Sequence, residues 1–235
     1  MKKVLVSGGN GKFAEKLVQY NTEYEMIALG KSDLDVTDPS NIETVIGELM
    51  PDIFIHAAAL TRPMAHHNVF PDKSIRSNII GTSNVVLACL KRDIKLVYIS
   101  TDFVYPGTEG NYKETDGVFP VNKYAWSKLG GECAVQLYDN SLILRVSMCD
   151  DPYPHPKAFV DLKKSTIYNT DAAKVVLNLL DKTGIINVGG DSIFLYDFVK
   201  KKNPEIGKIS LKNVHDVEMP TDVSMNCGKM KRVLK

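Results

Sequence analysis

Short apolar segments alternate with helix-length segments through the first 147 residues, and this alternation constrains the fold more than any other feature of the sequence. Strands are predicted at 3–7, 26–29, 52–56, 95–100 and 141–146. Helices are predicted between them at 12–20, 39–50, 72–92 and 122–138. Strands that are joined through helices form right-handed crossovers and a parallel sheet covered on both faces. We therefore expect an α/β fold, with a Rossmann-type doubly wound parallel sheet.

The character of the sequence changes after residue 147. Asp150–Pro156 is rich in proline and is incompatible with a regular helix or a central strand. A helix at 171–182, a strand at 185–188 and a helix at 195–202 are predicted beyond it. We therefore divide the chain into a Rossmann domain at 1–147 and a small C-terminal lobe at 148–235. The lobe is expected to interleave with the sheet and not to fold as an independent domain.

Composition excludes several classes of function. The net charge of +1 provides no basic surface for a polyanion, so no nucleic-acid partner is expected. The four cysteines lack metal-ligand spacing, which indicates reduced thiols and no metal site. No apolar run approaches the ~20 residues of a membrane helix. The sequence enters a strand at once, without an apolar leader, and a cytoplasmic location is therefore expected.

A glycine-rich loop, Ser7–Ala14, lies between the first predicted strand and the first predicted helix. Gly8 permits a tight turn, and Gly11 permits the backbone to approach a pyrophosphate at the helix N-terminus. Ala14 is small enough for close packing of helix on strand. The position of the loop at the first strand–helix turn favours dinucleotide binding. The alternative interpretation is an ordinary helix start preceded by turn glycines.

The end of the second predicted strand bears on the choice of cofactor. The chain reads Leu29-Gly30-Lys31-Ser32 there, with no carboxylate to hold a ribose 2′-hydroxyl. A cation at this place accommodates a 2′-phosphate. Lys31 and Ser32 therefore favour NADP(H), while NAD(H) stays open because lysine is also a common surface residue.

Three polar residues point to the chemistry. Tyr124 and Lys128 are four residues apart, which places them on one face of a helix. An ammonium beside a phenol would lower its pKa from ~10 and make it a usable proton donor. Thr101 ends the fourth predicted strand, where ligands of open α/β sheets bind, and its hydroxyl can orient a substrate oxygen. Separately, these residues also suit an exposed helix face and a strand-end turn.

Taken together, the motifs resemble the extended short-chain dehydrogenase/reductase superfamily and, more narrowly, its dTDP-4-dehydrorhamnose reductase branch. The resemblance spans nearly the whole chain. It is carried by the glycine loop and the following segments: Leu34–Asp38, Pro51–Thr61, Ser100–Tyr105, Tyr124–Glu132, Leu144-Arg145, Pro220–Ser224 and Gly228–Met230. It implies a Rossmann fold with a small substrate-binding lobe and an NAD(P)-dependent oxidoreductase.

The resemblance also implies roles for particular residues. Thr101, Tyr124 and Lys128 match the catalytic hydroxyl, the general acid and the lysine, of which the last two also meet the cofactor. The other residues implied in cofactor binding are Gly8, Asn10, Gly11, Lys12, Phe13, Asp35, Val36, Ala57, Ala58 and Ala59. Asp35 and Val36 match positions that meet adenine, and the three alanines lie on a strand end against the cofactor. Asn78 matches an asparagine that supports the site.

Phe103 separates this chain from similar dehydratases. Those enzymes carry Thr-Asp-Glu, whereas a phenylalanine in the third position cannot transfer a proton. Two departures concern the substrate: the stretch from Arg145 to Asp171 is short for the family, and Ser147-Met148-Cys149 replaces an expected Ser-Trp. His66 and His67 are interpreted as loop histidines, either at the mouth of the site or simply solvated.

Three hypotheses follow. The first is an NADPH-dependent reductase of a nucleotide-linked 4-keto-6-deoxy sugar, in which Tyr124 protonates the alkoxide. The second is a nucleotide-sugar epimerase that holds NAD tightly and returns the hydride. The third is a non-catalytic regulatory subunit of a methionine adenosyltransferase type, which the short substrate lobe motivates. In this superfamily the long helix and the helix that carries Tyr124 often form a dimer interface. A homodimer is therefore an option that the sequence leaves open.

Overall fold

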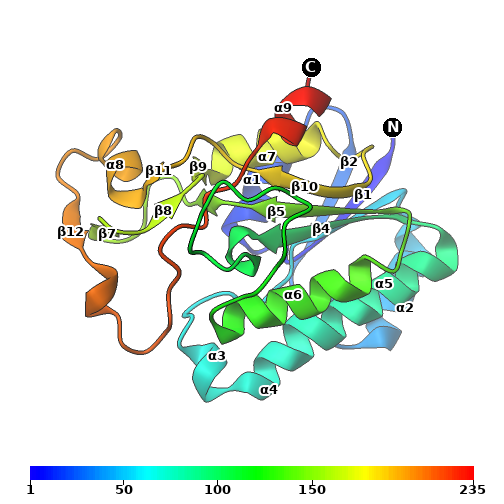
Figure 1. Cartoon of the computed structure of the whole chain (residues 1–235). Coiled ribbons are helices and arrows are strands. Elements are labelled where there is room, and N and C mark those ends of the chain that lie inside the picture. Colours follow the sequence, from blue (N-terminus) through cyan, green and yellow to red (C-terminus); the bar gives the residue numbers. More distant parts are fainter.

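The computed structural model describes residues 1–235 and is built on one six-stranded parallel sheet (Figure 1). Neighbouring strands lie in the order β2-β1-β3-β4-β5-β10 and all run parallel. The bounds of these strands are β1 Lys3–Ser7, β2 Glu25–Leu29, β3 Ile53–His56, β4 Lys95–Thr101, β5 Ser141–Val146 and β10 Gly184–Val188. The strand order reverses between β1 and β3. Ligands of open α/β sheets bind at such a switch point, outside the carboxyl ends of the strands.

Helices cover both faces of this sheet (Figure 1). On one face α1 (Lys12–Tyr20) packs against α7 (Asn169–Leu177), and the other face carries α2 (Pro39–Leu49), α5 (Gly81–Arg92) and α6 (Lys123–Val135). Side chains of a strand alternate between faces. Val4 and Val6 of β1 accordingly join the buried cluster under α1, while Leu5 joins the cluster under α2 and α5. The predicted doubly wound α/β fold is confirmed.

The start of α2 shows why the predicted helices form where they do. The Asp38 carboxylate accepts hydrogen bonds from the backbone N–H groups of Ser40 (2.9 Å) and Asn41 (3.2 Å). Pro39 takes the first helical position, where its missing N–H costs nothing. Met50 ends the helix in the left-handed conformation, with φ of 46°. The helix therefore begins at residue 39, as the sequence predicts.

The long predicted helix at 72–92 is interrupted in the structure. A helical segment runs through α4 (Pro71–Ser74), a π-helical turn η1 (Ile75–Ile80) and α5, and the short helix α3 (His66–Val69) precedes it. A π-helical turn inserts one residue and re-aims the side chains beside it. Here it holds Asn78, which is buried between the end of β3 and helix α6.

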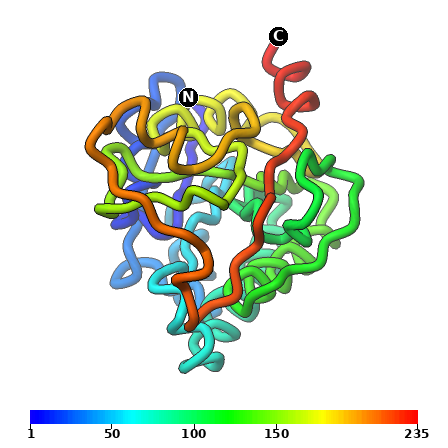
Figure 2. Tube along the Cα trace, turned by 60° about the vertical axis from the view of Figure 1, so that its left-hand side comes forward, coloured from blue at the N-terminus to red at the C-terminus, as the bar shows by residue number.

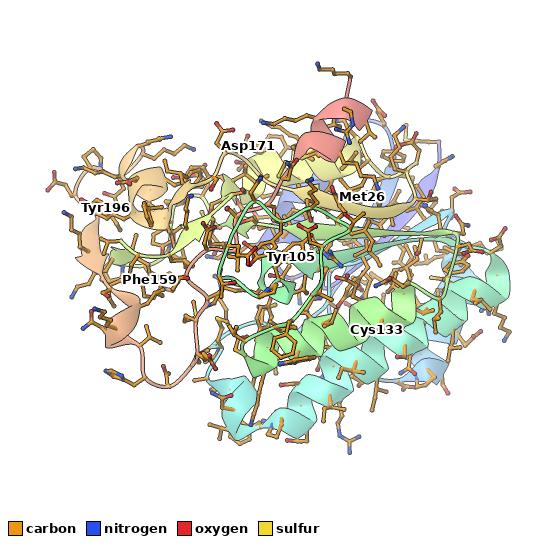
Figure 3. The ribbon with its side chains drawn as sticks, in the orientation of Figure 1. Met26, Tyr105, Cys133, Phe159, Asp171 and Tyr196 are labelled. Atoms are coloured by element: carbon orange, nitrogen blue, oxygen red, sulfur yellow. The ribbon has the colours of Figure 1, made fainter.

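The C-terminal lobe is built from pairs of short strands. The strands pair as β6 with β9, β7 with β12 and β8 with β11. Their bounds are β6 Met148–Cys149, β7 Lys157–Phe159, β8 Lys163–Lys164, β9 Ile167–Tyr168, β11 Ile193–Phe194 and β12 Gly207–Ile209. Met148 of β6 and Ile167 of β9 pack against the main core, whereas the other two pairs and α8 (Leu195–Lys200) border a separate apolar cluster. Phe159 and Tyr196, labelled in Figure 3, mark its place at one side of the molecule. By contrast, α7 and β10 belong to the layers of the main sheet.

The end of the chain returns to the sheet beside the lobe (Figure 2). Backbone N–H groups of Thr221 and Asp222 donate to the Gly107 carbonyl at 3.0 and 2.8 Å, and Val223 N–H donates to the Lys163 carbonyl at 3.0 Å. Helix α9 (Gly228–Val233) then packs near β10. Two short 3-10 turns complete the structure, η2 at Asp102–Val104 and η3 at Leu211–Asn213. None of the helices combines the length and the apolar character needed to cross a membrane.

Candidate functional site

A cleft of about 1260 Å³ opens at the carboxyl ends of β1, β3 and β4 and continues along the lobe. Every residue predicted for the site lines this cleft except Ser32. The lining therefore includes Gly8, Asn10, Gly11, Lys12, Phe13, Lys31, Asp35, Val36, Ala57, Ala58, Ala59, Thr101, Tyr124 and Lys128. The fold thus brings together side chains from five separate segments of the chain.

The glycine loop is pressed against the end of β3. Gly8 has a φ of +77°, and a Cβ added to it would lie 2.9 Å from the Cα of Ala58. Only glycine suits this position, because a side chain would collide with Ala58 and because other residues rarely adopt this backbone conformation. Gly11 N–H donates to the Gly8 carbonyl at 2.8 Å and leads directly into α1, whose first turn has no side-chain cap. The N-terminal N–H groups of α1 therefore face the cleft without a protein acceptor.

In the turn after β2, a carboxylate lies beside the lysine that was predicted to meet the cofactor. Lys31 Nζ lies 3.7 Å from Asp35 Oδ2, and the Lys31 side chain is 79% exposed. Burial acts to raise the pKa of Asp35, but hydrogen bonds from Thr37 and the charge of Lys31 hold it below its ordinary value. Ser32 does not line the cleft, and its hydroxyl donates to Asp33 at 3.1 Å on an exposed turn. Of the two residues that favour a 2′-phosphate, only Lys31 borders the cleft.

Asp150 connects three loops around the cleft. Its Oδ2 lies 3.1 Å from Lys12 Nζ, beside the glycine loop, and 3.3 Å from Arg62 Nη1, in the loop after β3. The other oxygen accepts a hydrogen bond from Asn169 at 3.5 Å. Two cations are thereby gathered at the place where the uncapped end of α1 opens into the cleft.

Thr101 and Tyr124 meet on the opposite side of the cleft. Thr101 is the last residue of β4, and its hydroxyl donates to Asp102 Oδ1 at 3.2 Å. Tyr124 lies in the first turn of α6, which the Asn122 side chain caps by accepting from Ala125 N–H at 3.0 Å. Asn122 also donates to the Glu218 carbonyl at 3.0 Å, so the start of this helix is tied to the returning end of the chain.

Burial dominates the proton chemistry of Tyr124 and Lys128. Loss of water raises the pKa of Tyr124 to about 12, although the Thr101 hydroxyl lowers it through a hydrogen bond. Loss of water lowers the pKa of Lys128 to about 7, against the opposing charge of Glu132. Lys128 Nζ sits 4.2 Å above the ring of Tyr98. The predicted lowering of the Tyr124 pKa by Lys128 is not seen, because burial raises the pKa and the groups that lower it are Thr101 and Arg62.

Aromatic rings hold Tyr124 on two sides. The His67 ring meets it edge-on at a centroid distance of 5.3 Å, and the Phe103 ring does so at 6.4 Å. His67 is fully buried and shares a hydrogen bond of 2.7 Å between its Nδ1 and Ser74 Oγ, whereas His66 is exposed. Neither histidine lines the cleft. The expectation of two loop histidines is therefore wrong for His67, which is part of the packing behind Tyr124.

Asn78 and Lys164 support the site from outside the predicted set of cofactor and catalytic residues. Asn78 pairs with both backbone groups of Leu60, at 2.8 and 2.9 Å, and donates to Ser127 Oγ at 2.8 Å. Lys164 reaches from the lobe to within 3.0 Å of Asp102 Oδ2. Sequence reasoning had a signal for Asn78 in the family resemblance. It had none for Lys164, Arg62 or Asp150, which lie in short or irregular segments with no periodic pattern.

Comparisons with known proteins agree with this architecture. The family model described as the RmlD substrate binding domain matches residues 1–180. The chain is 30% identical over 203 residues to a dTDP-4-dehydrorhamnose reductase of Aggregatibacter actinomycetemcomitans, covering 77% of this chain and 68% of that protein. It is 28% identical over 143 residues to the methionine adenosyltransferase 2 subunit beta of Pongo abelii, covering 57% of this chain and 42% of that protein. The chain thus spans less than half the length of the second relative.

A solved structure extends the similarity over almost the whole chain. The dTDP-4-dehydrorhamnose reductase of Bacillus anthracis, solved in complex with NADP, superimposes with a TM-score of 0.89 at 25% sequence identity. The match covers 99% of this chain and 93% of that one. The sheet and the lobe therefore both have counterparts in that structure.

Proposed function

Because the chain belongs to the RmlD substrate binding domain family, we propose that it is an NADPH-dependent reductase of a nucleotide-linked 4-keto-6-deoxy sugar. The observation that carries the proposal is the meeting of Thr101, Tyr124 and Lys128 in a cleft whose other half is a glycine loop. Relatives named dTDP-4-dehydrorhamnose reductase support the substrate class, and an NADP complex of one of them supports the cofactor.

The cofactor half of the cleft fits a dinucleotide. A Cβ at Gly8 would fill the space between the loop and Ala58, so the glycine keeps a cradle open there. The uncapped first turn of α1, with Lys12 and Arg62 beside it, suits a pyrophosphate. Ala57, Ala58 and Ala59 offer small side chains beneath a nicotinamide ribose, and Lys31 is the cation available to a 2′-phosphate. Bound NADPH supplies the hydride for reduction of the keto carbon.

The chain's own residues then manage the oxygen. Thr101 orients the carbonyl oxygen, and Tyr124 donates its phenolic proton to the alkoxide that forms. The phenolate left behind gains the adjacent charge of Lys128 when that lysine is protonated, and takes a proton from solvent to reset the site. Phe103 contributes no proton, so elimination of water from the sugar is not assisted. The balance is one ketone, one hydride and one proton giving one alcohol.

The proposal also includes a cytoplasmic location and self-association through the face formed by α5 and α6. Large apolar side chains are exposed on that face, among them Leu87 at 65% and Leu90 at 52% on α5 and Trp126 at 46% on α6.

The first test is cofactor binding to the purified protein, followed by nicotinamide fluorescence with NADPH and with NADH. We expect saturable binding that is tighter for NADPH and is weakened by Lys31→Ala. Lys91→Ala, which alters a surface lysine paired with Glu43, is the matched control and is expected to bind as the parent does. A screen of nucleotide-linked keto sugars should then show stoichiometric oxidation of NADPH.

Two outcomes would reject the reductase. Cofactor that stays bound through purification, with no net NADPH consumption, would favour the epimerase. A folded protein that binds neither cofactor but co-purifies with an enzyme partner would favour a regulatory subunit. The similarity to a methionine adenosyltransferase subunit is the observation that keeps this second function in view.

A further inference from the structure

A buried ion pair lies behind Thr101. Lys164 Nζ is 3.0 Å from Asp102 Oδ2, and the two side chains are 10% and 1% exposed. Asp102 follows Thr101 at the end of β4, whereas Lys164 is the last residue of β8 in the lobe. Removing two charges from water carries a large desolvation cost. The proton transfer proposed above assigns neither residue a role.

Asp102 and the cleft compete for the proton of the Thr101 hydroxyl. Thr101 Oγ1 donates to Asp102 Oδ1 at 3.2 Å, because an ionised carboxylate can only accept. The Phe103 backbone N–H donates to the same Oγ1 at 3.3 Å. Thr101 has a single hydroxyl proton, so the more strongly Asp102 attracts that proton, the less it is available to Tyr124 or to a substrate oxygen.

Thr101 and Asp102 both act on the pKa of Tyr124. Burial raises its pKa most; the hydrogen bond with Thr101 then lowers the pKa, and the negative charge of Asp102 raises it. Lys164 lies on the far side of Asp102, with its ammonium 4.3 Å above the Phe103 ring that also packs against Tyr124. Lys164 therefore offsets the charge of Asp102 directly and rests on the same aromatic ring, while Arg62 is the cation that lowers the Tyr124 pKa itself.

We propose that Lys164 and Asp102 are positioning residues for Thr101 and Tyr124: Lys164 offsets the charge of the Asp102 carboxylate, so that the Thr101 hydroxyl stays free to donate its proton to the oxygen of Tyr124 or of the substrate. The proposal rests on the proposed function, in which Tyr124 is the proton donor. It makes the C-terminal lobe part of the proton-transfer machinery, because the lobe supplies the cation.

The coupling can be measured without a substrate, by nuclear magnetic resonance of protein labelled with ¹³C at the tyrosine ζ carbon. Tyr124→Phe identifies the Tyr124 resonance among the 10 tyrosines. We expect this resonance to move in Lys164→Met and in Asp102→Asn. The matched control is Lys163→Met, which alters the neighbouring lysine, paired with Asp222 at 3.5 Å and 39% exposed. It should leave the resonance in place.

A folding defect is separated from the proposed effect by two further readings. The resonance of Tyr138, whose hydroxyl donates to the Ile94 carbonyl just before the start of β4, at the end of the strand away from Asp102, should stay where it is in the parent. The double variant Lys164→Met/Asp102→Asn leaves no unpaired charge in the buried site, and should still move the Tyr124 resonance. An unmoved Tyr124 resonance in folded Lys164→Met, or in the double variant, would overturn the proposal.

Kinetics provide the second readout. We expect kcat to fall by about 10- to 100-fold in Lys164→Met, the size of effect that small misplacements of reacting groups produce, with KM and cofactor affinity unchanged. Lys164→Arg should recover much of the rate. A parental kcat, or a loss confined to KM, would overturn the proposal. Should the parent reduce no nucleotide-linked keto sugar, the proposed function fails, and the Tyr124 resonance alone still decides the positioning role.

Discussion

At the scale of single residues, burial sets the working conditions of the site. Tyr124 and Lys128 carry opposite tendencies, since loss of water favours the neutral form of each: it raises the pKa of the phenol to about 12 and lowers that of the lysine to about 7. Sequence spacing alone placed them on one helix face but was silent on how deeply that face is buried. The proton chemistry of the pair is therefore a property of the fold as much as of the residue types.

The depressed pKa of Lys128 predicts how stability depends on pH. Between the pKa of about 7 in the folded chain and the ordinary lysine value of 10.5, the unfolded chain binds more protons than the folded chain. The free energy of unfolding should therefore rise with pH across this window, by up to about 1.4 kcal/mol per pH unit. Below it the lysine is charged in both states, and its contribution no longer changes.

The measurement is urea denaturation of the parent and of Lys128→Met at a series of pH values from 6 to 9. The free energy of unfolding of the parent should rise relative to that of Lys128→Met as the pH rises above 7. Lys123→Met, an exposed lysine of the same helix, serves as the control and should track the parent. Parallel curves for the parent and Lys128→Met would show that Lys128 titrates normally.

At the scale of elements, the most regular segments were predictable and the irregular ones were not. The bounds of β1, α1 and β5 agree with the sequence patterns, and α2 begins at its predicted first residue because Asp38 and Pro39 encode the helix start locally. The π-helical turn η1 has no comparable signal in its own sequence. It places Asn78 against Leu60 and Ser127, which come from other segments of the chain. The two-residue strands of the lobe, such as β8, are too short for any periodicity to show.

The candidate site divides in the same way. Thr101, Tyr124 and the glycine loop were accessible to sequence reasoning, because each sits at a fixed place relative to a strand or a helix. Lys164 was not, since its partner Asp102 lies far earlier in the chain and the two meet only once the lobe is packed. The burial of His67 was missed for a similar reason, as its cover is supplied by other segments of the chain.

Asn78 should contribute more to the free energy of unfolding than an ordinary helix asparagine does, because its side chain pairs with both the backbone N–H and the carbonyl of Leu60. Asn78→Ala leaves those two groups without partners, at a cost of about 1–3 kcal/mol each where they stay buried. We expect a clear loss of stability in urea denaturation and weaker cofactor binding, since Leu60 continues the strand end that lines the cleft.

The matched control is Asn84→Ala, on the same helical segment, which removes one hydrogen bond of 3.1 Å to the Val36 carbonyl. Its loss of stability should be the smaller, and its cofactor affinity should be that of the parent. Equal losses of stability in the two variants would mean that the hydrogen bonds to Leu60 stabilise the fold no more than the single bond to Val36 does.

At the scale of the whole molecule, one buried network joins the sheet to α6 and to the C-terminal part of the chain. Glu132 of α6 binds Arg145 of β5 and accepts a hydrogen bond of 2.7 Å from Ser100 of β4. Arg145 donates at 2.9 Å to the hydroxyl of Tyr105, labelled near the centre of Figure 3, which in turn donates to Asn187 of β10 at 2.8 Å. Charged and polar side chains thus connect β4 and β5 with helix α6 and with β10.

Glu132→Gln removes one partner of this buried pair and leaves Arg145 uncompensated. Such changes cost about 3–5 kcal/mol, which we expect to see as a lower midpoint of urea denaturation. Glu43→Gln breaks a surface pair with Arg92 and Lys91 and should have a much smaller effect. Equal midpoints for the parent and Glu132→Gln would show that the network tolerates the loss of this charge.

The return of residues 219–226 to the middle of the chain has a consequence for the order of assembly. Thr221 and Asp222 pair with Gly107, and Asn226 with Tyr112, more than a hundred positions earlier. A ribosome therefore releases the glycine loop, Thr101 and Tyr124 well before the segment that ties down the start of α6 and the lobe. Contacts between such distant positions form slowly, because the intervening chain must be closed into a loop first. In a newly made molecule the nucleotide end of the cleft can take shape early, whereas the wall that carries Lys164 is completed last.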